Sequence, residues 1–190
     1  MTATDTDVGE VEKMFAVNLF GPMRMIRHFH PLLIKGKGTV VNIGSVGGIV
    51  PYVYGSSYNA SKAALHHWGN TLRVELKPLG VNVVNIISGE VSSNILKRDQ
   101  SRSRELPETS FYLPLRTEFS KHINRVPNTT TPTEYAGRVV AEVTRSRPKA
   151  WFWTGSRSRE VRFYDTVFPR TYWASDRLFT REFNLNKLKL

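Results

Sequence analysis

The sequence contains no cysteine, which excludes disulfide bonds and metal sites built from thiolates. It also has no run that approaches the roughly 18 consecutive apolar residues of a membrane-spanning helix, and Met1 begins no secretory signal pattern. The five histidines are scattered or adjacent, as at His66 and His67, and no pair has the spacing of a metal-binding motif. We therefore expect no metal site, and we expect His66 and His67 to be surface or half-buried packing residues.

A glycine-rich turn of the form G-x-G-x-x-G or T-G-x-x-x-G-x-G is absent as well. In dinucleotide-binding folds such a turn follows the first strand and opens the helix whose N-terminus receives the pyrophosphate. Gly36-Lys37-Gly38 and Gly47-Gly48 do not have this spacing. A dinucleotide-binding fold in this chain would therefore lack its first strands and its phosphate-binding turn.

Acidic residues are in short supply, with 16 of them against 27 lysines and arginines, so the formal net charge is +11. Residues 1–93 hold 8 basic and 6 acidic side chains, whereas residues 94–190 hold 19 and 10. Nucleic acid, anionic lipid and phosphate-bearing small molecules are all compatible with this surplus, and so is simple solubility. Because no nucleic-acid-binding module accompanies the charge, we expect no nucleic acid partner.

The hydrophobic pattern predicts a strand, a helix and a second strand in residues 39–87. The two strands, 39–43 and 81–87, are apolar almost throughout, which is typical of parallel strands covered on both faces. A helical pattern over about 57–79 joins them, and a βαβ unit of these lengths predicts an α/β fold with a parallel sheet. An earlier helix should begin after Asp5–Asp7, bend at Pro22 and end near Pro31.

Residues 94–132 are polar and irregular, and they are expected to form a lid-like loop that includes Arg98, Arg102 and Arg104. Thr131-Pro132-Thr133-Glu134 then has an N-cap, a proline at N1 and a capping-box glutamate, so a helix should run from there to about Arg147. Trp151-Phe152-Trp153 predicts a short last strand.

Residues 156–190 form a basic and aromatic C-terminal extension. Its arginines and aromatic residues are Arg157, Arg159, Arg162, Phe163, Tyr164, Phe168, Arg170, Tyr172, Trp173, Arg177, Phe179, Arg181 and Phe183. One interpretation is a helical lid that packs its aromatic residues on the core. The other is an interfacial surface, with aromatic residues at headgroup depth and arginines on lipid phosphates. The sequence leaves both open.

Tyr58 and Lys62 are spaced four residues apart on the predicted helix, so both side chains lie on one face. An ammonium held near a phenol favours the phenolate, and we expect Lys62 to lower the pKa of Tyr58 toward neutrality. A group tuned in this way is suited to general acid–base catalysis. Ser45 lies thirteen residues earlier, where the first predicted strand ends, and ligands of open α/β sheets bind at that edge.

The order and spacing of Ser45, Tyr58 and Lys62 resemble the catalytic serine, tyrosine and lysine of the short-chain dehydrogenase/reductase family. Asn18, in Phe15-Ala16-Val17-Asn18-Leu19-Phe20-Gly21, matches the asparagine that completes the family's catalytic set. The resemblance implies that Tyr58 exchanges the proton and that Lys62 holds the ribose. It also implies that Ser45 binds the substrate oxygen and that Asn18 anchors a relay water.

The family also places a cofactor-contacting P-G-x-V-x-T segment after the second predicted strand. This chain keeps Gly89 and Val91, has Ser93 for the threonine, and has Ser88 for the proline, which should loosen the turn. Cofactor contacts are thus expected from Asn18, Tyr58, Lys62, Gly89, Val91 and Ser93. The resemblance implies the C-terminal half of a Rossmann-like doubly wound parallel sheet over residues 1–155, with the extension 156–190 after it.

Five short stretches narrow the resemblance within the family: Pro31-Leu32-Leu33-Ile34, Leu72-Arg73-Val74-Glu75-Leu76, Ser93-Asn94-Ile95, Leu106-Pro107-Glu108 and Phe168-Pro169-Arg170. In these the sequence most resembles fungal acyl-dihydroxyacetone-phosphate reductases. This implies NADPH as cofactor, with NAD left open, and a small carbonyl or alcohol substrate that could be linked to a lipid. It also implies a cytoplasmic location, with peripheral contact to the endoplasmic reticulum or lipid droplets through the basic extension, and leaves a homo-oligomer open. The alternative is a truncated, inactive relative that acts by binding or has no activity of its own.

Overall fold

The computed structural model describes residues 1–93, 105–127, 129–168 and 180–188. Predictions that involve Arg98, Arg102 and Arg104, or Arg170, Tyr172, Trp173, Arg177 and Phe179, lie outside these residues. None of the helices in the described ranges combines the length and the apolar character that crossing a bilayer requires.

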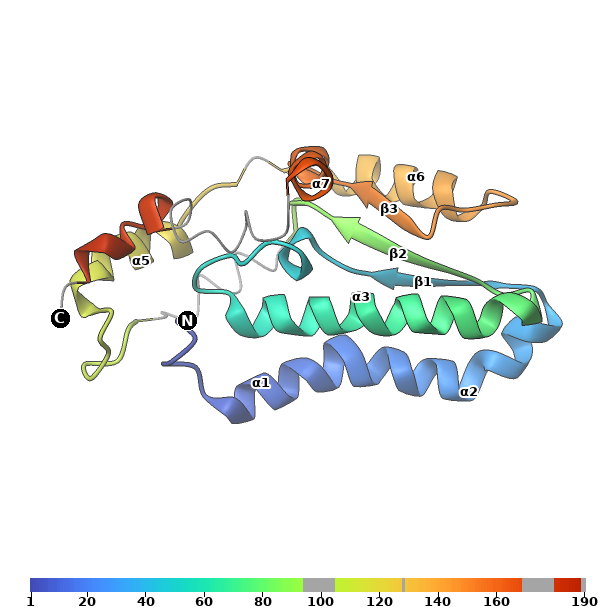
Figure 1. The fold of residues 1–190 in the computed structure, drawn as a ribbon, viewed down its shortest axis with the longest axis horizontal. Helices are drawn as coiled ribbons and strands as arrows, with labels where there is room; N and C mark the ends of the chain where they lie inside the picture. The colour runs from blue at the N-terminus through green and yellow to red at the C-terminus, as the bar shows by residue number, and fades with distance from the viewer. Residues whose placement is uncertain (94–104, 128, 169–179, 189–190) are drawn as a thin grey trace.

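A parallel sheet in the order β1-β2-β3 forms the centre of the fold (Figure 1). Its strands are β1 (Thr39–Ile43), β2 (Asn82–Ser88) and β3 (Trp151–Thr154). Val41 is level with Val84, and Ile86 is level with Phe152. The long helix α3 (Ser56–Leu76) crosses from β1 to β2, which confirms the predicted βαβ unit and the α/β fold.

Helices lie on both sides of the strands. In Figure 1 the elements follow one another from α1 (Val8–Phe15) and α2 (Gly21–Lys35), through α3, to the three strands and then α6 (Pro132–Val143). The helix α7 (Ser158–Val167) follows β3 and packs against it. The helix α5 (Arg116–Ile123) lies apart from the sheet, beside residues 180–188.

The helix α2 extends beyond Pro31, near which the sequence predicts its end. The helix continues through Pro31 to Lys35 and ends at Gly36. Pro31 has no N–H to give to the carbonyl of Arg27, and His30 Nδ1 lies 3.0 Å from that oxygen and 3.2 Å from the oxygen of Ile26. The imidazole of His30 therefore replaces the hydrogen-bond donor that Arg27 loses because residue 31 is proline. The helix continues beyond Pro31. A π-helical segment over Ala16–Phe20 lies just before Pro22, the position at which the sequence predicts a bend.

The segment predicted as an irregular loop is partly helical. It contains a 3-10 turn (Leu113–Leu115) and α5, and buries Leu106, Leu115 and Phe119. Phe183 of the C-terminal extension lies in the same apolar cluster and meets Tyr54 edge to face. Long-range packing, which local sequence does not show, stabilises the described part of this segment, from Leu106 to α5.

The helix α6 begins as predicted, because the Thr131 side chain accepts a hydrogen bond from the N–H of Glu134. It ends at Val143, four residues before the predicted end. Thr144 closes it with backbone bonds to the carbonyls of Val140 and Glu142. The strand over Trp151–Thr154 is confirmed.

Candidate active site

The first candidate residue, Ser45, sits on the turn that follows β1. Its extended backbone makes it the N-cap of a 3-10 turn over Val46–Gly48, and its Oγ accepts a hydrogen bond of 3.0 Å from the N–H of Gly47. Ser45 is buried, with 9% of its surface exposed. The capping bond fixes the hydroxyl oxygen at the carboxyl end of the strand.

Tyr58 lies next to this hydroxyl. A Cβ placed on Gly47 would be 3.3 Å from the ring of Tyr58 and 3.4 Å from the Oγ of Ser45, so both side chains converge on Gly47. Tyr58 is 38% exposed. The phenol and the serine hydroxyl are therefore together at a position that a ligand from solvent can reach.

Lys62 lies one turn further along α3 on the same face, as the spacing predicts. Its Nζ is 5.7 Å from the centroid of the Tyr58 ring and donates a hydrogen bond of 2.9 Å to the carbonyl of Ile43. The ammonium thus joins the helix to the last residue of β1.

The pKa of Tyr58 moves in the direction opposite to the one that the sequence predicts. Burial raises it above its usual value, and a hydrogen bond with Ser45 offsets part of the rise. Burial also lowers the pKa of Lys62. The ammonium lies over the ring and is bonded to Ile43, so it does not dominate the charge balance at the phenol oxygen.

Asn18 is placed by the π-helical segment between α1 and α2. Its Nδ2 donates a hydrogen bond of 3.0 Å to the Oγ of Ser61, and that hydroxyl donates one of 2.8 Å to the carbonyl of Tyr58. π-helical segments inside helices are frequent at functional sites. Asn18 is thereby tied to the stretch of α3 that carries Tyr58 and Lys62.

The predicted cofactor segment follows β2. The N–H of Gly89 donates to the carbonyl of Thr154, and a Cβ on Gly89 would lie 1.9 Å from the carbonyl oxygen of Ser156. Only glycine fits this approach of two backbones. Val91 forms a bridge with Thr130, and Ser93 is exposed.

Ser88, expected to loosen this turn, is instead held in place. Its Oγ lies 2.5 Å from the hydroxyl of Tyr135 on α6, and it is buried. A side-chain hydrogen bond therefore restrains the position at which the family has proline.

His66 was not expected at the site, and the prediction of a surface or half-buried residue is wrong. It is 3% exposed, and its Nε2 accepts a hydrogen bond of 3.2 Å from the N–H of Ser45. Tyr58, Lys62 and His66 follow one another at intervals of four residues, so this spacing was the signal that could have placed His66 on the same face.

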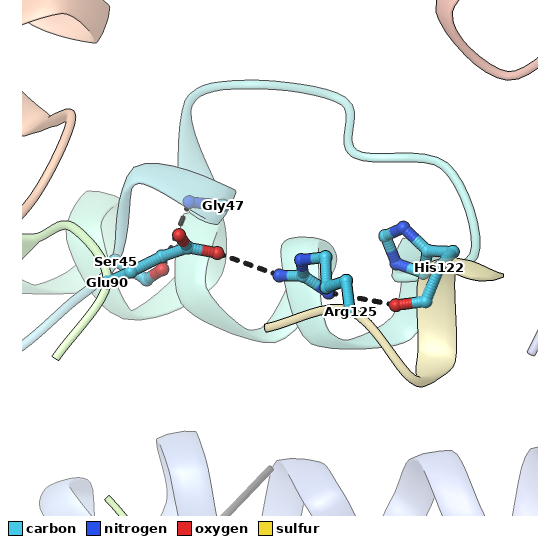
Figure 2. A network of polar contacts seen from close by, with 5 residues as sticks. All are labelled: Ser45, Gly47, Glu90, His122 and Arg125. Carbon is cyan, nitrogen blue, oxygen red and sulfur yellow. Dashed lines mark hydrogen bonds and ion pairs between the residues drawn. The ribbon is translucent and has the colours of Figure 1, made fainter. Parts of the chain in front are cut away.

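A second unexpected feature is an ion pair beside the cofactor segment (Figure 2). Arg125 donates to the Oε1 of Glu90 over 2.8 Å and to the carbonyl of His122 over 3.4 Å. Glu90 stands between Gly89 and Val91, and Arg125 follows α5. The pair joins two segments that are 35 residues apart in the sequence, and no local sequence pattern predicts it.

The parallel α/β fold and the placement of Ser45, Tyr58 and Lys62 at the end of β1 agree with the resemblance that the sequence predicts. A family model described as short chain dehydrogenase matches residues 1–104. The chain therefore belongs to the short-chain dehydrogenase/reductase family.

Fungal relatives cover nearly the whole chain. It is 59% identical over 189 residues to the short-chain dehydrogenase virD of Hypocrea virens, and spans 64% of that protein. It is 35% identical over 190 residues to the NADPH-dependent 1-acyldihydroxyacetone phosphate reductase of Saccharomyces cerevisiae, and spans 62% of it. The predicted likeness to these reductases is confirmed, although other fungal short-chain dehydrogenases match at higher identity.

Solved structures show the same fold. A short-chain dehydrogenase from Streptomyces avermitilis superposes with a TM-score of 0.70 at 20% identity. The match covers 96% of this chain and 66% of that one. The chain thus matches part of a Rossmann-like dehydrogenase, and it spans slightly less than two thirds of the fungal relatives named above.

Proposed function

We propose that the chain carries the catalytic half of an NADPH-dependent short-chain dehydrogenase/reductase that interconverts a carbonyl and an alcohol. The observation that supports this most strongly is the convergence of Ser45 and Tyr58 on Gly47, with Lys62 one turn away. A proton donor, a hydroxyl and an ammonium at the carboxyl end of a parallel strand are what such a reaction requires.

The residues present fit the nicotinamide end of the cofactor. Tyr58 and Lys62 are partly exposed at the edge of the sheet where dinucleotides bind, and Gly89, Val91 and Ser93 follow the neighbouring strand. We assign the nicotinamide and its ribose to these residues together with Asn18. No glycine-rich turn in the sequence fits the pyrophosphate. NADPH is favoured over NADH by the name of the yeast relative.

In the reducing direction a bound nicotinamide would supply the hydride for the carbonyl carbon. Tyr58 gives its phenolic proton to the carbonyl oxygen, so that a new C–H and a new O–H bond replace the C=O π bond. The raised pKa of Tyr58 keeps the phenol protonated at neutral pH, as a proton donor must be. Ser45 orients the substrate oxygen, and its hydrogen bond favours the tyrosinate that the transfer leaves. Lys62 holds the ribose.

The substrate class that we propose is a lipid-linked ketone. Its support is the name of the yeast relative, together with the exposed apolar side chains and arginines of α7. Phe163 and Val167 are 58% and 56% exposed on this helix, and Arg159 and Arg162 are exposed beside them. Such a surface suits peripheral contact with anionic lipid, at the endoplasmic reticulum or lipid droplets. A homo-oligomer stays a prediction.

The second candidate function is binding without catalysis. Its basis is that residues 1–190 include no glycine-rich turn for the pyrophosphate. Titration of the purified chain with NADPH separates the two candidates, since the absence of saturable binding contradicts the enzyme.

Turnover is then measured with 1-acyldihydroxyacetone phosphate and with an unphosphorylated ketone. Tyr58→Phe should lower it by roughly 10²–10⁴-fold, the usual contribution of a general acid. Tyr54→Phe is the matched control, because it removes a buried hydroxyl that has no hydrogen-bond partner among the described residues. Equal turnover in Tyr58→Phe and the control contradicts the assignment of Tyr58.

A further inference from the structure

The side chain of His66, on α3, contacts the turn that contains Ser45. Its Nε2 accepts a hydrogen bond from the backbone N–H of Ser45, a buried donor that would otherwise lack a partner inside the protein. The ring also contacts Trp151 of β3, with the two ring centroids 5.4 Å apart. The imidazole is therefore held between β3 and the serine turn, and its acceptor nitrogen faces the turn.

Two glycines of this turn, Gly44 and Gly48, leave room for the ring. A Cβ on Gly44 would lie 2.1 Å from His66 Nε2, and a Cβ on Gly48 would lie 2.6 Å from His66 Cε1. Real Cβ atoms do not approach so closely, so any side chain at either position would push the imidazole away. The course of the turn from Gly44 to Gly48 follows the shape of the ring.

The tautomer of His66 follows from this contact. Because Nε2 accepts a hydrogen bond, the proton of the neutral ring is on Nδ1. Nδ1 is buried and has no partner among the described residues. Burial, with the positive charge of Lys62 nearby, lowers the pKa of His66 to about 4, so the ring stays neutral and keeps its acceptor at ordinary pH.

We propose that His66 is a positioning residue of the active site, which sets the Ser45 hydroxyl against Tyr58 by holding the backbone N–H of Ser45 through Nε2. The proposal rests on the proposed function, in which Ser45 and Tyr58 act on the substrate oxygen. His66 touches neither substrate nor cofactor in this assignment. Its effect passes through the turn, whose Ser45 Oγ also accepts from Gly47.

The pKa of Tyr58 depends on the position of the Ser45 hydroxyl, and it can be measured even if the chain has no enzymatic activity. The hydrogen bond with Ser45 lowers that pKa, so displacement of the serine hydroxyl should raise it. Tyrosine labelled with ¹³C at Cζ gives the titration of Tyr58 by NMR, with the signal assigned through Tyr58→Phe. In His66→Leu, which removes the acceptor, the midpoint should move upward. In His66→Gln, whose Oε1 replaces the acceptor near Nε2, it should stay close to that of the wild type.

His67→Leu is the matched control, because His67 is the exposed neighbour on the same helix. An unchanged Tyr58 midpoint in folded His66→Leu overturns the proposal. If His66→Leu does not fold, the tautomer of His66 in the wild-type chain tests the proposal instead. ¹⁵N-histidine spectra must show the Nδ1–H tautomer of His66, with a coupling across the hydrogen bond from the Ser45 amide, and the Nε2–H tautomer overturns the proposal.

Kinetics add a second readout where the chain turns over. His66→Leu should lower kcat about tenfold while the KM for NADPH stays near the wild-type value, and His66→Gln should restore most of kcat. Equal losses in both variants, in proportion to their lowered stability, indicate a structural role alone and contradict the proposal. A wild-type chain that binds no NADPH contradicts the proposed function, whereas the tautomer and the Tyr58 titration still decide the role of His66.

Discussion

The ammonium of Lys62 is bonded to the carbonyl of Ile43, the last residue of β1, and lies over the ring of Tyr58. This hydrogen bond fixes the position of the Lys62 ammonium relative to the end of β1. It also leaves the remaining N–H donors of the ammonium for other acceptors. The reach of Lys62 toward a ribose is therefore fixed by the strand as well as by the helix.

Replacement of this ammonium should affect binding and catalysis more than folding. Lys62→Met keeps the apolar stem, and Ile43 is 48% exposed, so water can take the place of the lost donor. We expect weaker NADPH binding and a fall in kcat/KM of roughly 100-fold, the order of effect of an acid–base group. Lys77→Met, at an exposed lysine beyond α3, serves as the charge control. Parallel kinetics and thermal melts test this, and equal kcat/KM in the two variants contradicts it.

The Glu90–Arg125 pair should matter for the cofactor segment and little for global stability. Both side chains are partly exposed, at 30% and 42%, and such pairs contribute about 0–1 kcal/mol. Glu90→Gln should lower the melting temperature by at most a few degrees and raise the KM for NADPH several-fold, because Glu90 lies between Gly89 and Val91 in the sequence.

The matched control for this variant is Glu134→Gln, which breaks the exposed Glu134–Arg138 pair on α6. It should cause a stability change of the same size without a change in KM. A KM that moves equally in both variants, or in neither, shows that the Glu90–Arg125 pair does not position the cofactor segment.

Acid should destabilise the fold through buried histidines. The pKa of His66 is lowered to about 4 from a usual value of 6.5, so between these two values the unfolded chain binds a proton that the folded chain does not. Stability is then complete above about pH 6.5 and falls as the pH is lowered toward 4, by about 1.4 kcal/mol per pH unit for this one group. His122, also at about 4, adds to the slope.

Urea unfolding at pH 7, 6 and 5 measures this effect. The groups around His66 are Lys62, whose charge lowers its pKa, and His67 and Asp165, which line the same cavity. His66→Gln removes one of these histidines and should reduce the dependence of the free energy of unfolding on pH between pH 4 and 6.5. A free energy of unfolding that is the same at pH 5 and pH 7 is incompatible with neutral buried histidines.

The surface of α7 should bind anionic vesicles. Phe163→Ala removes an exposed aromatic side chain beside Arg159 and Arg162, and should weaken sedimentation with phosphatidylserine vesicles several-fold. Val140→Ala, at a side chain of comparable exposure on α6, is the control and should have no effect. Added salt should weaken binding of the wild-type chain, because part of the attraction is electrostatic. Equal sedimentation of the two variants removes the support for lipid contact.

The sequence by itself determined the features that depend on near neighbours. The spacing of Tyr58 and Lys62 placed both on one helix face, the cap at Thr131 marked the start of α6, and the apolar runs marked parallel strands. Hydrogen bonds and periodicity within a few residues decide these features, so local reasoning found them. The same reasoning placed Ser45 at the end of a strand, where the structure finds it against Tyr58.

Only the tertiary structure decided the contacts between distant segments. Phe119 and Phe183 meet at Tyr54, Arg125 reaches Glu90, and His66 takes the N–H of Ser45. Burial is decided the same way, and burial reversed the expected pKa shift of Tyr58 and turned His66 from an expected packing residue into a partner of the serine turn. Desolvation depends on everything packed around a group, and the neighbours that supply it are far away in the sequence.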